Sequence, residues 1–480
     1  SELGTLDATS ITGNGSAITL NANDNITVSQ VWSYTSKTGG NGGDITLISK
    51  TGAIDSTAGD VRSGFTSAGD GGAIRFEAQG NITTKTLSAD SDISGKGGDI
   101  TLISSLGEID TSLGILDADS ANGKGGNVIL TALGDITTGT INSRARESSN
   151  DSGIISITSS NGAINTTKGS LNSNSALGNG GAVTLNAKGE ILTKDIVSKT
   201  GGAGKGGDIS ASSNAGLIDT SAGILDTTSV SGIAGDVSLS APKGITVGGI
   251  NANGLPKTGN ISLTSDKISF TGEANSIQGK GNLLLQPFTA SQNLDVSTVN
   301  FDVFAEGFAS IIIGAENGSG VITIPNAIAF SDPVIIQSPD GKIIVNGAIT
   351  GTDDASITLS GKTNLNADII TAEQDINLKG SVLLGKNVTL STGVTAGGNI
   401  SVDGTIDGNQ NLTLETGTGD INLNGAVGSS IPLNDLVINS TKSTTAKSIT
   451  AASITQKAAT GTTTLGDLNT NSETGINLAG

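Results

Sequence analysis

The sequence predicts an all-β protein, a parallel β-helix in which each coil has three faces. A glycine-rich turn followed by alternating apolar residues recurs at a nearly constant spacing through the first half. Short strand-like pieces lie between turns rich in Gly, Asn, Ser and Lys. Helical periodicity is absent from this region. One such period is too short to bury its own apolar side, so successive periods are expected to stack.

The repeat itself fixes the length of the predicted coils. It begins at Gly15, Gly42, Gly71, Gly97, Gly125, Ser152, Gly180, Gly206, Ala234 and Thr258, as in GSAITL, GGDITL and GGAVTL. The difference between successive starting positions is 27 from Gly15 to Gly42 and stays close to that value along the series. Apolar residues alternate within each motif, which indicates strands with one side facing an interior.

Three strands are predicted within one period, for example Asp44–Ser49, Ala53–Ser56 and Val61–Thr66. Stacked coils, ~4.8 Å apart, place like residues above like. The expected interior columns contain Ile45/Leu47, Ile74/Phe76, Ile100/Leu102, Val128/Leu130 and Val183/Leu185, and a second file contains Ile54, Ile82, Ile109 and Ile136. The intervening Thr46, Arg75, Thr101 and Thr184 are expected to point outward.

Coils of two types alternate. The residue after the second-strand Ile runs Thr27, Asp55, Thr83, Asp110, Thr137, Asn165, Leu192, Asp219 and Thr246. One explanation is electrostatic, because carboxylates on every coil would lie ~4.8 Å apart and repel, whereas alternate coils separate them by ~9.6 Å, close to the Debye length. The other explanation is duplication of a two-coil unit without an electrostatic purpose.

An interruption is predicted between the two halves. Six of the eight Phe lie between Phe270 and Phe330, and four of the seven Pro lie between Pro287 and Pro339. The stretch 298–307 predicts one short helix that begins at Thr298. Its aromatic residues, Phe301 and Phe304, and the following Phe308 are expected to seal the core; an aromatic platform for a ligand is the alternative.

We therefore expect three regions: a regular β-helix over 1–265 with coils of two alternating types, an irregular Phe- and Pro-rich segment over 266–333, and a β-helix with shorter, less regular coils over 334–480. Roughly 19 coils at ~4.8 Å each would make a rod about 90 Å long. Both ends read as if more coils follow, since an open terminal coil is an unpaired β edge.

Composition excludes several classes of chemistry. The sequence contains no His, Cys or Met. Imidazole bases, thiolate nucleophiles, disulfides and thiolate metal sites are therefore unavailable. The absence of Met indicates a processed product or an internal piece. Asp and Glu outnumber Lys and Arg by 44 to 25, which disfavours nucleic acid and anionic membrane surfaces as partners. Neither a transmembrane segment nor an export signal is found in the chain.

Several candidate sites can be considered, and no catalytic, cofactor-binding or metal-binding residue is assigned. A carbohydrate-cleaving enzyme would need acids that converge on one face. Asp117 and Asp119 share a face and Asp353 and Asp354 are adjacent, but both pairs are interpreted as acids of turns or solvated faces. Scattered weak calcium sites at Gly-Asp turns remain open. The GKGG sequences at Gly95, Gly123 and Gly204 are interpreted as turns, not phosphate loops, since neither Ser/Thr nor a helix follows.

A third class, ice binding, needs an unbroken outward threonine ladder. This ladder is interrupted by Arg75, Asp110, Asn165 and Leu192. Ice binding is therefore disfavoured.

The chain resembles filamentous-haemagglutinin-type repeat exoproteins, particularly cyanobacterial ones. The resemblance rests on the GGDI coils at Gly42, Gly97 and Gly206, on LLLQPF and the residues after it from Leu283, and on DGNQNLTLETGTGDINLNGAV from Asp407. It covers nearly the whole chain and implies a right-handed parallel β-helix, secretion through an outer-membrane partner, and roles in adhesion or filaments. The family's Asn-Pro-Asn secretion motif is not found here.

The expected function is a non-catalytic structural or adhesive segment of a long secreted bacterial surface fibre. The alternative is a carbohydrate-binding or carbohydrate-degrading β-helix protein. Expected partners are further coils, from the same chain or from other copies end to end, and surface glycans or neighbouring cells. Recognition is expected on a flat strand face or in the irregular region 270–339.

Overall fold

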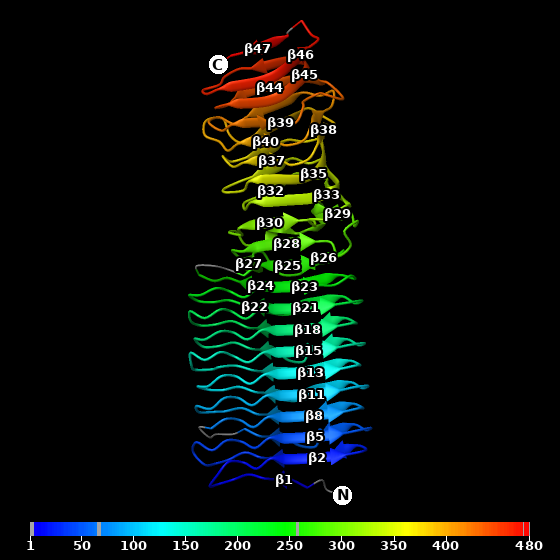
Figure 1. Cartoon of the computed structure of the whole chain (residues 1–480), viewed down its shortest axis with the longest axis vertical. Coiled ribbons are helices and arrows are strands. Elements are labelled where there is room, and N and C mark those ends of the chain that lie inside the picture. The colour runs from blue at the N-terminus through cyan, green and yellow to red at the C-terminus, as the bar shows by residue number, and fades with distance from the viewer. Residues whose placement is uncertain (1–3, 65–68, 256–258, 474, 480) are drawn as a thin grey trace. The chain divides into compact units, whose positions relative to one another are not determined.

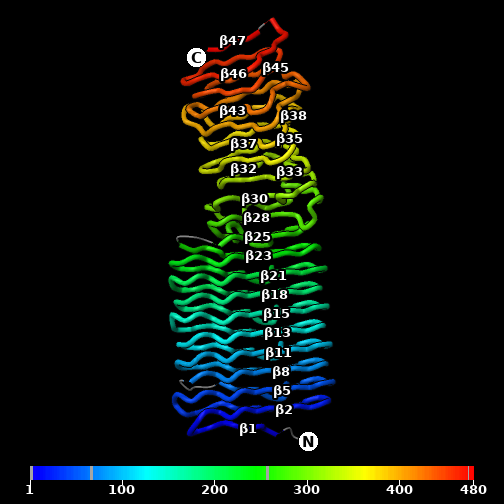
Figure 2. Tube along the Cα trace, viewed as in Figure 1, coloured from blue at the N-terminus to red at the C-terminus, as the bar shows by residue number. Residues whose placement is uncertain are grey.

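In the structure, a computed structural model, residues 4–64, 69–255, 259–473 and 475–479 are described. Parallel strands stack as the coils of a β-solenoid, as predicted (Figure 1). The chain divides into two compact units, 1–281 with 302–305, and 282–301 with 306–480. Figure 2 shows that the backbone coils follow one another with little variation in the first unit.

A coil of the first unit contains up to three strands, for example β5 (Ile45–Ser49), β6 (Ile54–Ser56) and β7 (Val61–Arg62). The predicted residues Phe65, Thr66 and Thr258 lie outside the described part of the chain. The strands that follow the glycine-rich turns are β2 (Ile18–Ala22), β5, β8 (Ile74–Ala78), β11 (Ile100–Ser104), β13 (Val128–Ala132), β15 (Ile155–Ser159), β18 (Val183–Ala187), β21 (Ile209–Ser213), β23 (Val237–Ser240) and β25 (Ile261–Thr264).

The other two faces of the first unit form a separate sheet. Some of its strands run through both faces without a break. Its strands are β1 (Leu6–Asp7), β3 (Ile26–Thr27), β4 (Val31–Trp32), β6, β7, β9 (Ile82–Thr84), β10 (Leu87–Ser88), β12 (Ile109–Asp117), β14 (Ile136–Asn142), β16 (Ile164–Asn165), β17 (Leu171–Asn172), β19 (Ile191–Leu192), β20 (Ile196–Val197), β22 (Ile218–Asp226), β24 (Ile245–Ala252), β26 (Ile268–Phe270) and β27 (Ile277–Gly279).

The predicted interior columns are confirmed. Ile54 pairs with Ile82, Ile82 with Ile109, and Ile109 with Ile136, and each of these side chains is at most 1% exposed. The column that contains Leu47 and Phe76 is equally buried. Burying one such side chain contributes ~1.5–3 kcal/mol. The repeated aliphatic positions therefore account for most of the driving force for coil stacking.

The repeated Gly-Gly-Asp turn has a structural role that was not predicted. The Asp carboxylate accepts a hydrogen bond from a backbone N–H of the next coil, at 2.8 Å from Asp44 to Ala73, 2.7 Å from Asp99 to Asn127 and 2.8 Å from Asp208 to Asp236. A Cβ added at Gly42 would collide with the carbonyl oxygen of Ser63. The glycines therefore let two segments approach closely, and the Asp binds the coils together.

The alternation of coil types is also confirmed in register, since Asp55 lies between Thr27 and Thr83. Its carboxylate accepts a hydrogen bond from the Thr57 N–H at 2.9 Å, and Asp110 accepts one from Ser112 in the same way. Each of these turns is closed by a hydrogen bond within one coil, so it does not require an Asp at the same position of the neighbouring coils. The electrostatic explanation of the alternation remains a prediction.

A corner hydrogen bond alternates with the same two-coil period. A serine hydroxyl accepts a backbone N–H three positions later in every second coil, at Ser49, Ser104, Ser159 and Ser213. In the other coils, a side-chain oxygen of Asn25, Asn81 or Asp135 accepts a backbone N–H of the next coil. A hydrogen-bonding period of two coils therefore exists independently of charge.

The single helix predicted over 298–307 differs from the structure. Two 3-10 turns are found instead, η1 (Val296–Thr298) and η2 (Phe301–Val303), and the N-cap of η1 is Asp295. Val299 is extended (φ −89°, ψ 124°), which prevents a continuous helix. Phe304 meets Phe270 edge-on at 5.2 Å in the first unit.

The second unit contains shorter coils. One interior column runs Ile357–Ile376–Ile400–Ile421, with steps of 19, 24 and 21 residues, whereas the steps of the Ile54–Ile136 column in the first unit are 27 or 28 residues. Among the residues described, no helix is long and apolar enough to cross a membrane. The strands are β28 (Asn282–Gln286), β29 (Leu294–Asp295), β30 (Ser310–Ile313), β31 (Val321–Ile324), β32 (Ile328–Phe330), β33 (Val334–Val345), β34 (Ile349–Gly351), β35 (Ile357–Leu365), β36 (Ile369–Thr371), β37 (Ile376–Leu378), β38 (Val382–Leu384), β39 (Val388–Ser391), β40 (Ile400–Val402), β41 (Ile406–Asp407), β42 (Leu412–Glu415), β43 (Ile421–Leu423), β44 (Leu433–Ser440), β45 (Thr444–Gln456), β46 (Thr463–Thr470) and β47 (Ile476–Leu478).

Candidate functional site

The two acid pairs considered in the sequence lie in different environments. Asp353 and Asp354 are exposed in a turn closed by the Ala355 N–H, which donates to the Thr352 carbonyl at 2.9 Å. The turn interpretation holds for this pair. Asp119, in contrast, is 1% exposed, so its interpretation as an acid of a turn or solvated face is wrong. Asp119 can be buried because the guanidinium of Arg144, on the next coil, neutralises its charge.

Asp90, Asp117, Asp119, Arg144 and Arg146, here called the Asp–Arg cluster, come from three successive coils. They lie at or just beyond the ends of β10, β12 and β14. The bridges from Ser91 to Ser120 and from Ser120 to Ala145 fix the register of these coils. In this register Asp90, Asp119 and Arg144 follow one another from coil to coil. Parallel stacking therefore brings together side chains that are a whole coil apart in the sequence.

The Asp119 carboxylate is held almost entirely by Arg144. The Arg144 Nη2 and Nε atoms donate to Oδ2 of Asp119 at 2.6 and 2.9 Å, and the Arg144 backbone N–H donates to Oδ1 at 2.7 Å. Arg146 lies beside them, with its Nε 3.8 Å from Asp119 Oδ2, and it also binds Asp92 at 2.8 Å. Hydrogen bonds between charged groups such as these are shorter and stronger than those between neutral groups.

Two neighbouring carboxyls hold protons more tightly than usual. Burial, reinforced by the charges of Asp119 and Asp90, raises the pKa of Asp117 to about 7. Burial also raises the pKa of Asp90, although a hydrogen bond from the Ser88 hydroxyl opposes this shift. The Asp–Arg cluster can therefore take up or release a proton near neutral pH.

Sequence reasoning missed the two arginines, although a signal for them existed. Adding the 27 residues that separate Ile109 from Ile136 to Asp119 leads to Arg146. A register shift between Thr111 and Ile115 shortens this part of the coil by two residues, so Arg144 lies over Asp119 instead. The repeat length therefore leads to the arginine pair but not to the member that neutralises Asp119.

An outward column runs from this cluster toward the first coils. Asp117 pairs with Ser88, Ser88 with Arg62, and Arg62 with Trp32. The Trp32 and Tyr34 rings are 6.2 Å apart and tilted by 52°. Aromatic, basic and acidic side chains thus share one strand face, a mixture that suits recognition of polar ligands.

The remaining candidate motifs are engaged within the fold. In the GKGG turn at Gly95, the N–H groups of Lys96, Gly97 and Gly98 donate to Asp70, Lys124 and Ala89. These groups cannot cradle a phosphate at the same time. Within the described ranges, no three His, Cys, Asp or Glu side chains are arranged to hold a metal ion.

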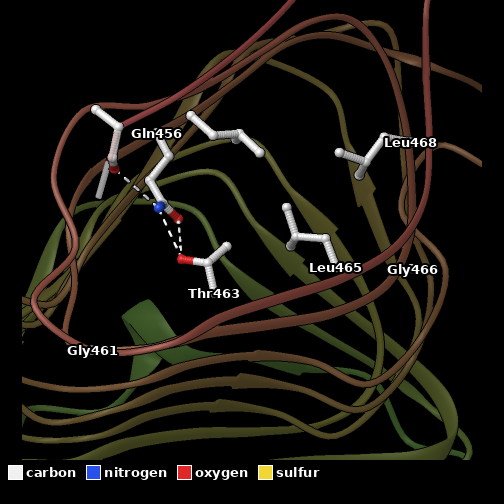
Figure 3. A pocket seen from close by; sticks show the side chains of 8 residues that line it. Gln456, Gly461, Thr463, Leu465, Gly466 and Leu468 are labelled. Carbon is white, nitrogen blue, oxygen red and sulfur yellow. Dashed lines mark hydrogen bonds between the residues drawn. The ribbon is translucent and has the colours of Figure 1, made fainter.

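A hollow lies inside the coil formed by β45, β46 and β47. Its volume is about 490 Å³ (Figure 3). Gln456 donates to the Thr463 hydroxyl at 2.9 Å and to the Ala479 carbonyl at 3.2 Å, while Leu465 and Leu468 line the same space. Ile476 is 45% exposed, although its register partner Ile454 is 1% exposed. The aliphatic column is therefore open to solvent at this coil.

Comparisons of the chain with protein-family models, with curated proteins and with solved structures found no match.

Proposed function

We propose that this chain is a non-catalytic structural or adhesive segment of a long bacterial cell-surface fibre, secreted to the outside of the cell. The observation that supports it best is the stacking of identical positions in register, which fixes the outward side chains in regular columns. Such columns place outward side chains at a constant spacing along a face, which suits attachment to extended or repeated ligands. Surface glycans and neighbouring cells are the partners that we propose.

The burial of Asp119 supports a structural role for the Asp–Arg cluster. A catalytic acid or base must come within hydrogen-bond reach of the substrate. The Asp119 side chain is 2% exposed and already accepts three hydrogen bonds from Arg144. Its neutralising contacts therefore stabilise the stack of coils and leave little room for a substrate.

Further coils are the second proposed partner. Ile476 and Leu478 continue the interior columns of β45 but are 45% and 43% exposed. Covering them with another coil, from the same polypeptide or from another copy, would bury apolar surface and pair an open strand edge.

Electron microscopy and a cell-binding assay test this function together. Purified chain is expected to bind bacterial cells or their isolated surface polysaccharide saturably, and to form end-to-end filaments when further coils are supplied. Replacing Trp32 with Ala should weaken attachment if the outward column is the adhesive face, whereas Phe288→Ala, an exposed aromatic outside it, is the control. Absence of both attachment and filaments would contradict the proposal.

The raised pKa of Asp117 favours one alternative, cleavage of a polysaccharide. An acid that is still protonated near pH 7 beside an ion-paired carboxylate is the combination that glycosidases use. A reducing-sugar assay over a panel of polysaccharides tests it. Turnover that is lost in Asp117→Asn but kept in Asp110→Asn would establish the enzyme and overturn the non-catalytic function.

A further inference from the structure

A shallow groove of about 510 Å³ lies in the second unit on the outward side of four successive strands, β33, β35, β38 and β41. It runs across the strands, so its length over the four coils is ~14 Å at ~4.8 Å per step. Two of its lining residues are exposed aliphatic side chains: Leu383 on β38 is 41% exposed, and Ile431 at the β41 end is 45% exposed. Exposed aliphatic side chains in a groove favour an apolar ligand.

Two lysines line the β33 and β35 end of this groove. Lys342 and Lys362 pair in register on adjacent strands, so their positive charges oppose each other. Neither forms an ion pair in the part of the chain that the structure describes. This arrangement occurs in a chain with a net charge of −19. A bound anion would relieve the repulsion that the fold leaves in place.

The other end of the groove is fixed by the backbone. Asp407 accepts hydrogen bonds from the N–H groups of Ser430 and Ile431 at 2.7 and 3.1 Å. The Gly408 N–H donates to the Ile431 carbonyl at 3.0 Å. These contacts hold the Ile431 backbone in place before any ligand arrives, which lowers the entropic cost of binding.

We propose that this groove binds a single-chain anionic amphiphile of the long-chain fatty-acid class. The carboxylate lies between Lys342 and Lys362, and the alkyl chain runs over Leu383 toward Ile431. Among the described residues that line the groove none is aromatic, so a sugar ring would lack a flat stacking surface. The proposal is independent of the adhesive function, since it concerns a different face and a different ligand.

Fluorescence titration of the full chain with 11-(dansylamino)undecanoic acid tests the groove. We expect saturable one-site binding that decanoate displaces more strongly than decanol, because decanol lacks the charge. Lys342→Gln and Lys362→Gln should each weaken binding by up to about fivefold, and together by about tenfold, as expected for exposed ion pairs. Leu383→Ser should weaken it by about fivefold through lost apolar contact.

Lys386→Gln is the matched control, since Lys386 is an exposed lysine on the coil of Leu383 that does not line the groove. Circular dichroism should show that all variants keep the wild-type fold. Absent saturable binding, or binding unchanged by the lysine substitutions, would overturn the proposal. Displacement by oligogalacturonate with no dependence on Leu383 would also overturn it and would indicate an acidic-polysaccharide site.

Discussion

Charged side chains are treated differently in the two units. In the first unit, the coil register brings Arg144 over Asp119 and Lys199 within 3.1 Å of Asp226. In the second unit, the register brings Lys342 over Lys362, and its described residues form no ion pair. The same stacking rule thus neutralises charge in one unit and concentrates it in the other. The Asp119–Arg144 ion pair stabilises the fold of the first unit, whereas the lysines of the groove form no ion pair among the described residues.

The largest expected effect is loss of the arginine in the Asp–Arg cluster. Arg144→Met leaves Asp119 buried without its cation, which should lower the free energy of unfolding by about 3–5 kcal/mol. Lys362→Gln should leave stability unchanged or slightly higher, since it removes a like-charge contact. Urea unfolding followed by hydrogen exchange measures the free energy of unfolding of each variant. Equal effects of the two substitutions would remove the contrast between the units.

Core truncation tests whether both units depend on the same aliphatic columns. Ile109→Ala in the first unit and Ile376→Ala in the second each empty a position that is at most 1% exposed. Each should lower the free energy of unfolding by about 2–4 kcal/mol. Hydrogen exchange should show the loss mainly in the adjoining coils. A negligible effect at Ile376 would mean that the shorter coils are held together by other contacts.

The pH dependence of stability should differ between variants of the cluster. The folded-state pKa of Asp117, about 7, lies above its ordinary value of 3.8, so the folded state binds more protons between these values. Stability should therefore fall as pH rises from 4 through 7. Asp117→Asn should remove most of that fall, with Asp90 contributing the rest, and should exceed the wild type by about 1–3 kcal/mol at pH 8.

Asp110→Asn is the control for this pH experiment. It makes the same change on another face of the same strand, at the position where a later coil carries Asn165. Thermal melts at pH 4, 6 and 8 compare the three proteins. A wild-type profile that rises toward pH 8 would contradict the assigned role of Asp117.

The smallest expected effect concerns the alternating acids. Thr83→Asp places a third carboxylate between Asp55 and Asp110, one coil from each. At low salt this should lower stability by about 1 kcal/mol, and the loss should shrink at high salt. Thr83→Asn is the uncharged control. A loss that does not depend on salt would leave the hydrogen-bonding period as the explanation of the alternation.

Much of the fold could be predicted because it repeats. The Ile54–Ile136 column and the outward Thr46 follow from alternation and period alone. The single helix over 298–307 was not found, because the backbone is extended at Val299, and the helical spacing of the Phe residues does not encode that break. The groove also escaped prediction, since the position of Ile431 depends on backbone hydrogen bonds to Asp407. The repeat length alone would pair Asp119 with Arg146, because it does not encode the register shift in β12 that brings Arg144 over Asp119.

The two-coil period makes a pair of coils an interchangeable module. Ile164 and Ile218 occupy the same column two coils apart, and the coils between them contain one complete set of corner types. Removing the segment 164–217 would join the coil of Ile136 to that of Ile218 with every column and the Thr–Asp alternation preserved. Recombination between such modules can therefore shorten or extend the first unit without inventing a new contact, whereas the unequal coils of the second unit offer no equivalent crossover point.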